Sequence, residues 1–305
     1  MARLSRFYNQ NRHIIWIIIV SAVLVFGIIK ILNNIYKDKQ PINSSSTNST
    51  TTYNNDNYSI ISRTEVSEQE VNETTNVVDE FIKFCNNKDI SSAYNLLSKD
   101  CKETLYPTEE KFSKDYVENI FETYRIYDKK TWITDNEKIT YRINITEDIL
   151  STGNSQELAI EEYYTLVKED NQYKLNIHNY VGKEVINKSK TENNITFNVV
   201  ERYIYMEYEI YKINVNNLSN NKIMIDSKEK TRNVNIIDQN ELKYVAFLNE
   251  INENNLIIYP GINKDLKIKF NKSYNPKYMD EYMEFSDIVL DMDNKDNRGK
   301  IKIEL

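Results

Sequence analysis

The spacing of apolar residues from Val77 onwards predicts a helix at the start of the folded part of the chain. Apolar side chains recur three or four residues apart, at Val77, Val78, Phe81, Ile82 and Cys85. This spacing is typical of one face of an amphipathic helix. The polar stretch that follows, NNKD, predicts the end of the helix and the start of another element.

Two more helices are predicted before residue 125. Asp89 or Ser91 can cap the first of them, because either side chain can accept hydrogen bonds from N–H groups of the first turn. Pro107 and Thr108 open the second one. The apolar stripes of the two helices are Ala93, Leu96, Leu97 and Cys101, and then Phe112, Tyr116, Ile120, Phe121 and Tyr124.

After Trp132 the apolar period becomes two, which predicts strands. Every second residue from Ile139 to Ile145 is apolar, and the residues between are polar. Further strands are expected over residues 156–168 and 173–181, joined by the turn-rich residues 169–172. Helices followed by an antiparallel meander give an α+β order.

This order of elements resembles the cone-shaped fold shared by nuclear transport factor 2, ketosteroid isomerases and many bacterial surface domains. The likeness covers residues 72–188 and rests on two stretches, FIKFCNNKDISSAYNLLS from Phe81 and LVKEDNQYKLNI from Leu166. It implies a cone domain in which three helices cover a curved antiparallel sheet.

The pattern from residue 195 to the end is that of strands throughout. Apolar and polar residues alternate over 211–215, 266–270 and 301–305, and turn signals separate the strands. The stretches YKINVNN, LIIYPGINKDLKIKF and FSDIVLD resemble the telokin-like immunoglobulin modules of bacterial surface proteins. The resemblance implies an all-β, immunoglobulin-like sandwich.

Ahead of these domains, Ile14–Leu32 is long and apolar enough to span a bilayer. The run reads IIWIIIVSAVLVFGIIKIL, and its one charged residue, Lys30, lies near an end. About nineteen helical residues match the roughly 30 Å hydrocarbon core. A cleaved signal peptide has a shorter apolar region and small residues at its cleavage site. We therefore expect an uncleaved N-terminal transmembrane helix.

Charges beside the anchor favour a cytoplasmic N-terminus. Arg3, Arg6 and Arg12 precede the run without any acid, and positive charge favours the inner side. Everything beyond residue 33 is then outside the cell. The expected parts are a tail (1–13), an anchor (14–32), a disordered Asn/Ser/Thr-rich linker (33–75), a cone domain (76–188) and a sandwich (189–305).

The charge balance argues against nucleic acid as a partner. The 305 residues include 39 basic and 46 acidic side chains, a net charge of −7. Residues 1–40 hold six basic residues and one acid, so the remainder carries −12. An acidic surface is repelled by a polyanion. The excess of Asn, Ile, Lys and Tyr is typical of an AT-rich genome and suggests a low-GC, Gram-positive bacterium.

Cys85 and Cys101 are the chain's two cysteines, and each ends the apolar stripe of a predicted helix. Outside the cell, thiols tend to be oxidised, so we favour a disulfide that staples the two helices. In the chain-entropy model, closing the loop between the two cysteines stabilises the fold by roughly 3 kcal/mol. The alternative is two separate buried thiols. A metal site needs more ligands, and a nucleophile needs a base that only His178 offers there.

Ketosteroid isomerases hold a catalytic acid or base and an oxyanion hole inside the cone, so the resemblance suggests where chemistry would lie. The candidates are Glu161 or Glu162, Tyr163 or Tyr164, and His178. Adjacent residues of a strand face opposite sides, so one Glu and one Tyr are expected to point inward. A structural role for these residues is the favoured interpretation.

Two other stretches invite a function and are better explained by structure. RYIYMEYEIY, residues 202–211, has the aromatic residues of a sugar- or peptide-binding strip, but such strips more often form domain interfaces. DMDNKDN, residues 291–297, lacks the Gly and terminal Glu of a calcium-binding loop and predicts a hairpin turn. No residue is expected to bind a metal or a cofactor.

The sequence therefore predicts a single-pass, membrane-anchored extracellular protein that binds a protein or small ligand and is not an enzyme. One alternative is an assembly component of a cell-envelope transfer or secretion complex. Another is a cone-domain enzyme that uses an inward Glu/Tyr pair. The sequence names neither the ligand nor the oligomeric state.

Overall fold

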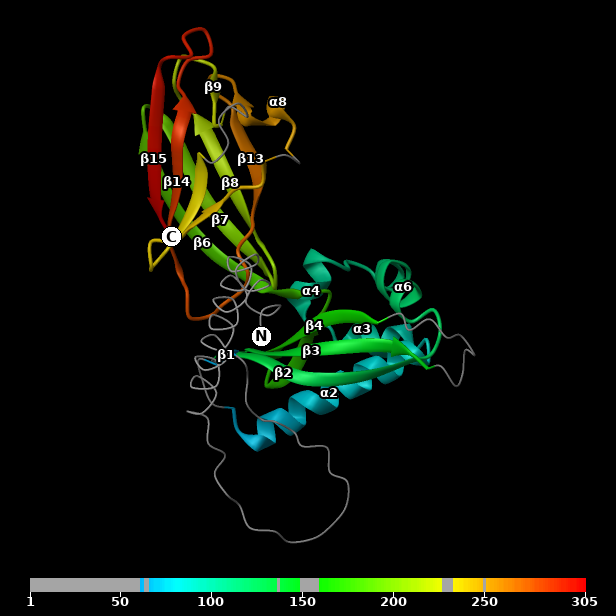
Figure 1. Ribbon diagram of the computed structural model, residues 1–305. Coiled ribbons are helices and arrows are strands. Elements are labelled where there is room, and N and C mark those ends of the chain that lie inside the picture. The colour runs from blue at the N-terminus through cyan, green and yellow to red at the C-terminus, as the bar shows by residue number, and fades with distance from the viewer. Residues whose placement is uncertain (1–60, 63–65, 136–137, 149–158, 227–232, 249–250) are drawn as a thin grey trace, which may run out of the picture. The chain divides into compact units, whose positions relative to one another are not determined.

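The computed structural model describes residues 61–62, 66–135, 138–148, 159–226, 233–248 and 251–305 (Figure 1). Antiparallel sheets make up the larger share of the regular structure, and all helices but one are short. The anchor predicted at Ile14–Leu32 lies outside the described residues. Within the described part, no helix is both long and apolar enough to cross a membrane.

The described chain begins with one long helix and a run of short ones. A capping box fixes the start of the long helix, because Ser67 and Glu70 each accept a hydrogen bond from the other's backbone N–H. The helical segments are α2 (Glu68–Asn86), α3 (Ile90–Leu96), α4 (Lys99–Thr104), α5 (Glu109–Phe112), the π-helical η1 (Ser113–Val117) and α6 (Glu118–Ile120).

The second predicted helix is divided into α3 and α4. Ser98 causes the break: its N–H donates to the carbonyl of Leu175 at 2.9 Å, and its hydroxyl accepts from the N–H of Cys101 at 2.8 Å. Ser98 therefore ends one helix and caps the next.

The first sheet follows the helices and runs in the order β1-β2-β3-β4-β5. Its strands are β1 (Ile61–Ser62), β2 (Arg125–Asp135), β3 (Lys138–Glu147), β4 (Ile160–Glu169) and β5 (Gln172–Asn176). All neighbours are antiparallel except β1, which pairs parallel with the end of β2. Helix α2 runs beside β2 and β3 (Figure 1). Apolar side chains from the helices and this sheet share one core, here called the first core.

Two further sheets hold the rest of the chain. One has the antiparallel order β13-β8-β7-β6, with β6 (Tyr180–Glu192), β7 (Ile195–Tyr205), β8 (Glu209–Asn217) and β13 (Asn263–Phe270). The other has the order β11-β10-β14-β9-β12, with β15 also paired to β14. Its elements are β9 (Ile223–Met224), β10 (Val234–Asp238), β11 (Lys243–Val245), helix α8 (Glu253–Leu256), β12 (Ile257–Ile258), β14 (Asp280–Val289) and β15 (Arg298–Glu304).

A second core fills the space between these two sheets. Phe197 from one sheet meets Phe285 from the other, with ring centroids 4.6 Å apart. Buried and half-buried residues alternate along β8, and Leu266, Ile268 and Phe270 are buried on β13, as the period of two predicts.

The expected boundaries differ from those of the elements. Helix α2 begins at Glu68, inside the predicted linker, because the capping box lies there. Strand β2 was not predicted at all. The boundary expected between residues 188 and 189 lies inside β6, which pairs with β7 from Tyr180 to Glu192. The change from the first sheet to the second therefore falls near residues 177–179.

Candidate functional site

Strand β4 carries the two pairs of candidates for the cone interior, Glu161 and Glu162 followed by Tyr163 and Tyr164. The structure buries Glu162 and Tyr164, leaves Glu161 exposed and half-buries Tyr163. One acid and one tyrosine thus point inward, as the alternation of a strand predicts. On the outer face, Glu161 forms an ion pair with Arg142.

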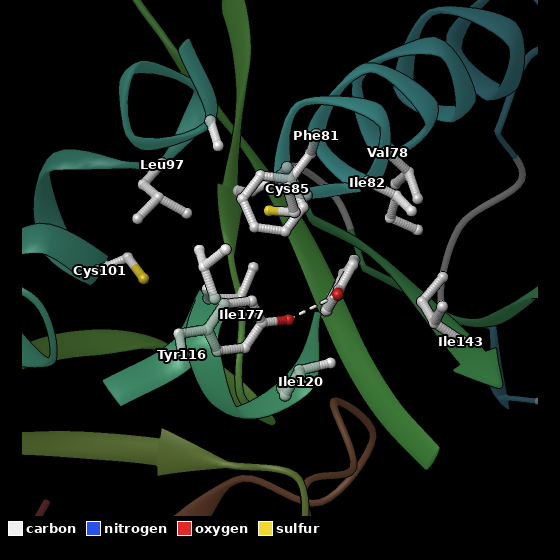
Figure 2. Close-up of a cluster of buried hydrophobic side chains, with 14 of the residues drawn as sticks. Val78, Phe81, Ile82, Cys85, Leu97, Cys101, Tyr116, Ile120, Ile143 and Ile177 are labelled. Atoms are coloured by element: carbon white, nitrogen blue, oxygen red, sulfur yellow. Dashed lines mark hydrogen bonds between the residues drawn. The ribbon is translucent and has the colours of Figure 1, made fainter. Parts of the chain in front are cut away.

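The inward Glu162 belongs to a buried network of hydroxyl groups. Tyr116, from η1, donates a 2.6 Å hydrogen bond to Oε2 of Glu162, and the hydroxyls of Tyr116 and Tyr164 are 2.6 Å apart. Phe81 packs edge-on against Tyr164, with ring centroids 5.6 Å apart. Figure 2 shows the ring of Tyr116 inside the first core, beside Ile177.

Burial dominates the electrostatics of this network. It raises the pKa of Glu162 to about 7, against the opposing effect of the hydrogen bond from Tyr116. Burial also raises the pKa of Tyr116 and Tyr164 well above the usual range, so both tyrosines keep their protons. Glu162 is only 5% exposed and both tyrosines are fully buried. The inward pair is therefore closed off by its own neighbours.

The third interior candidate, His178, lies outside this network. It occupies the turn between β5 and β6 with a positive φ of 59°. The residue is exposed, although partial burial lowers its pKa. Its Nδ1 shares a 2.9 Å hydrogen bond with the hydroxyl of Tyr106. The ring of Tyr116 separates His178 from Glu162.

The two cysteines lie in the first core as free thiols. Cys85 comes from α2 and Cys101 from α4, and both are fully buried. Figure 2 shows their sulfur atoms apart. The structure therefore corresponds to the alternative of two separate buried thiols. The disulfide between Cys85 and Cys101 stays a prediction for the oxidised protein. Burial raises the pKa of both thiols, which makes them poor nucleophiles.

A cluster of buried charges, which the sequence did not reveal, lies at one end of the second core. Lys272 is 3.2 Å from Glu209 and 2.6 Å from Asp280. Arg202 contacts the same two acids and reaches Glu184 at 2.5 Å. Burial and the nearby Asp280 raise the pKa of Glu209. Burial also favours a higher pKa for Asp280, but the charges of Lys272 and Arg202 outweigh burial, so the pKa of Asp280 is lowered.

The aromatic stretch 202–211 is divided among several roles. Arg202 belongs to the buried charge cluster, and Ile204 and Met206 pack with Ile133 from the first sheet. Tyr211 is fully buried in the second core. The contact with the first sheet accounts for Ile204 and Met206, whereas Arg202 and Tyr211 belong to the second part of the described chain.

Three large apolar side chains are exposed on two loops whose backbones are hydrogen-bonded to each other. They are Leu218, after β8, and Tyr259 and Ile262, between β12 and β13, which are 60%, 60% and 47% exposed. The ammonium of Lys222 lies 5.5 Å from the centre of the Tyr259 ring. We call these four residues the tip patch.

Asn217 joins the two loops of the tip patch. Its backbone N–H donates to the carbonyl of Ile262 at 3.0 Å, and its carbonyl accepts from the N–H of Gly261 at 2.7 Å. Its buried side-chain amide donates to the carbonyls of Asn221 and Ile258 at 2.9 and 3.1 Å. Gly261 has a φ of +71°, a conformation that favours glycine. The patch is therefore displayed on a hydrogen-bonded frame.

No cluster of three or more His, Cys, Asp or Glu side chains among the described residues is arranged to hold a metal ion. The acidic run 291–297 forms the turn between β14 and β15, where the N–H of Asp293 donates to the side chain of Asp291 at 2.9 Å. The acids of this run thus serve the turn.

Comparisons with known proteins do not assign the chain to a family. No protein-family model matches it, and no curated protein matches it at a significant level.

Proposed function

We propose that this protein is a non-catalytic binding module, held at the outer face of a cell membrane by Ile14–Leu32. Its N-terminus is cytoplasmic and its folded domains are extracellular. The apolar anchor run and the basic residues before it support this topology. The partner is a protein or a small ligand and not a nucleic acid, in keeping with the acidic chain.

We further propose that the helices and first sheet form a domain like nuclear transport factor 2, and that the other two sheets form a telokin-like, immunoglobulin-type sandwich. The order of helical segments followed by an antiparallel meander supports the first part. Two antiparallel sheets that share one core support the second.

The tip patch is the observation that carries the binding role. Large apolar side chains that lie together on the surface leave area in contact with water that a partner can bury. In the tip patch, three such residues lie on loops that Asn217 holds in place. A rigid apolar surface loses little conformational entropy on binding, so the patch suits a partner of complementary apolar shape.

The interior of the first core favours binding over catalysis. A general acid or base has to reach its substrate within hydrogen-bond distance. Glu162 is buried, and its inner neighbours Tyr116 and Tyr164 fill the space around its carboxylate. We therefore assign this network a structural role.

Site-specific photo-crosslinking in living cells tests the proposal. A photoreactive amino acid replaces Tyr259 in the full-length protein, and in a matched control it replaces Val185, which is 68% exposed on β6. We expect a discrete crosslinked product from position 259 and none from position 185. A product made of several membrane or secretion proteins would identify the assembly role instead.

A second variant tests the chemistry of the patch. Leu218→Ser in the chain that carries the crosslinker at position 259 should reduce the yield, because it removes apolar surface next to the probe without disturbing a core. Equal products from positions 259 and 185, or no product from either, would contradict the proposed binding role of the tip patch.

A further inference from the structure

Among the described residues, the outer edge of β2 has no partner strand over one short window. Strand β3 pairs with β2 along its length, whereas β1 pairs only with Ile133 and Thr134. At the other end, the side-chain amide of Asn86 donates to the carbonyl of Arg125 and accepts from its N–H, both at 2.9 Å. Within the described residues, no strand covers residues 126–132 on this side.

The backbone of this window is oriented to accept another strand. N–H and C=O groups of successive residues point alternately to the two sides of a strand. The N–H and C=O groups of Arg125 point away from β3, toward Asn86. Because the direction alternates, the N–H and C=O groups of Tyr127, Lys129 and Thr131 also point away from β3. An edge of this kind is a template for pairing with a further chain. Its limits, Arg125 and Ile133, are equally far from Lys129.

We propose that two copies of this chain pair antiparallel along this window, about a two-fold axis at Lys129. Lys129 then faces Lys129 of the second copy, and Tyr127 faces Thr131 of the second copy. This register forms about six backbone hydrogen bonds and joins the two first sheets into one continuous sheet. The interface is isologous, the commonest type in symmetric dimers.

Charge complementarity identifies the second copy as the occupant. Asp128 and Lys130 are both exposed on β2. In the proposed register, Asp128 of each copy lies opposite Lys130 of the other copy, so the pair occurs twice per dimer. Within its own sheet, Lys130 lies directly opposite Arg142, and like charges in that position are destabilising. No acid among the described residues forms an ion pair with Lys130. Asp128 of the second copy supplies one.

The arrangement differs from an edge that is only protected by charge. Charged residues often keep other strands away from an edge. Charges of one sign repel a second copy, whereas one acid and one base placed evenly about the axis attract it. On the inner face, each Lys129 already pairs with Asp79 of its own helix, so two uncompensated ammonium groups do not meet.

Apolar contacts complete the proposed interface. Ile126 is 47% exposed and lies opposite Trp132 of the second copy in this register. Beside it, a groove of about 500 Å³ separates the end of α2 from the start of β2, between Asn86 and Tyr124. Pairing of the two edges covers Ile126 and narrows the groove at each end of the interface.

Charge reversal tests the register directly. The mass of the full-length protein is measured by analytical ultracentrifugation in density-matched detergent for the unaltered chain, Asp128→Lys, Lys130→Asp and the double reversal. Each single reversal makes both contacts across the axis repulsive, so we expect dissociation to be favoured by about tenfold or more. The double reversal restores the opposite pairs and should restore the dimer. Asp265→Lys, on the edge strand β13, is the matched control.

A monomer at every concentration would overturn the proposal. A dimer that both single reversals leave intact would also overturn it, because the contact would then lie elsewhere, for example between anchors. Circular dichroism of each variant checks that the fold is retained, which the exposure of residues 128 and 130 leads us to expect.

Discussion

The hydroxyl of Tyr116 lies 2.6 Å from Oε2 of Glu162, deep between the helices and the first sheet. Burial raises the pKa of Glu162 from an ordinary value of 4.5 to about 7. Between these two values the folded chain holds a proton that the unfolded chain has released. The stability of the fold therefore decreases as the pH rises through this window.

Glu162→Gln should remove this contribution, because the amide does not titrate. We expect the unfolding free energy of the unaltered protein to fall by up to about 3 kcal/mol between about pH 4.5 and pH 7 through this group, and that of the variant to change less. Urea unfolding of both full-length proteins across this range measures the difference.

Glu161→Gln is the matched control on the same strand. Glu161 is exposed, and the hydrogen bond from Arg142 lowers its pKa, so its titration does not produce a decrease in stability with rising pH. Identical pH profiles for Glu162→Gln and the unaltered protein would show that Glu162 is not the titrating group.

The free thiols of Cys85 and Cys101 predict how many thiols per chain react with a thiol reagent. Both are fully buried, and burial raises their pKa. We expect a thiol reagent to react slowly with the native protein. Once the protein is unfolded without reductant, the reagent should react with two thiols per chain. Cys85→Ser should lower that count from two to one. A disulfide would give no thiols before the substitution and one after it, which would support the bridge.

The period of apolar residues predicted most faces of the elements correctly. The stripe of Phe81, Ile82 and Cys85 is buried on α2. Alternation predicted that one Glu and one Tyr of β4 point inward, and the structure shows that these are Glu162 and Tyr164. Such predictions succeed where one face of an element is buried and the other is in water.

Strand β2 was missed for a physical reason. Its first half is an edge in which Asp128, Lys129 and Lys130 stand in a row, so the apolar alternation is absent. The charge cluster was missed because Arg202, Lys272 and Asp280 come from distant parts of the chain and meet only in the fold. No local period marks a contact of that kind.

Lys272→Met should destabilise the second core strongly. Lys272 is 3% exposed and neutralises Glu209 and Asp280. Removal of one partner leaves buried charge without compensation, which typically costs about 3–5 kcal/mol. The loss should shrink at low pH, where the two acids take up protons. Urea unfolding at two pH values measures both effects.

Lys243→Met is the control for Lys272. Lys243 is more than half exposed, and its ion pair with Glu284 lies at the surface, where such pairs contribute at most about 1 kcal/mol. Equal losses for the two variants would show that the buried cluster contributes no more than a surface ion pair.

Asn217→Ala should loosen the tip patch and weaken whatever the patch binds. The amide of Asn217 serves two carbonyls and also accepts from Ser219, and each buried group left without a partner costs about 1–3 kcal/mol. We expect lower stability and a lower crosslinking yield at position 259. Asn216→Ala, half-buried on the same strand, should change neither. An unchanged yield for Asn217→Ala, together with the expected loss of stability, would mean that the partner does not need the frame that Asn217 holds.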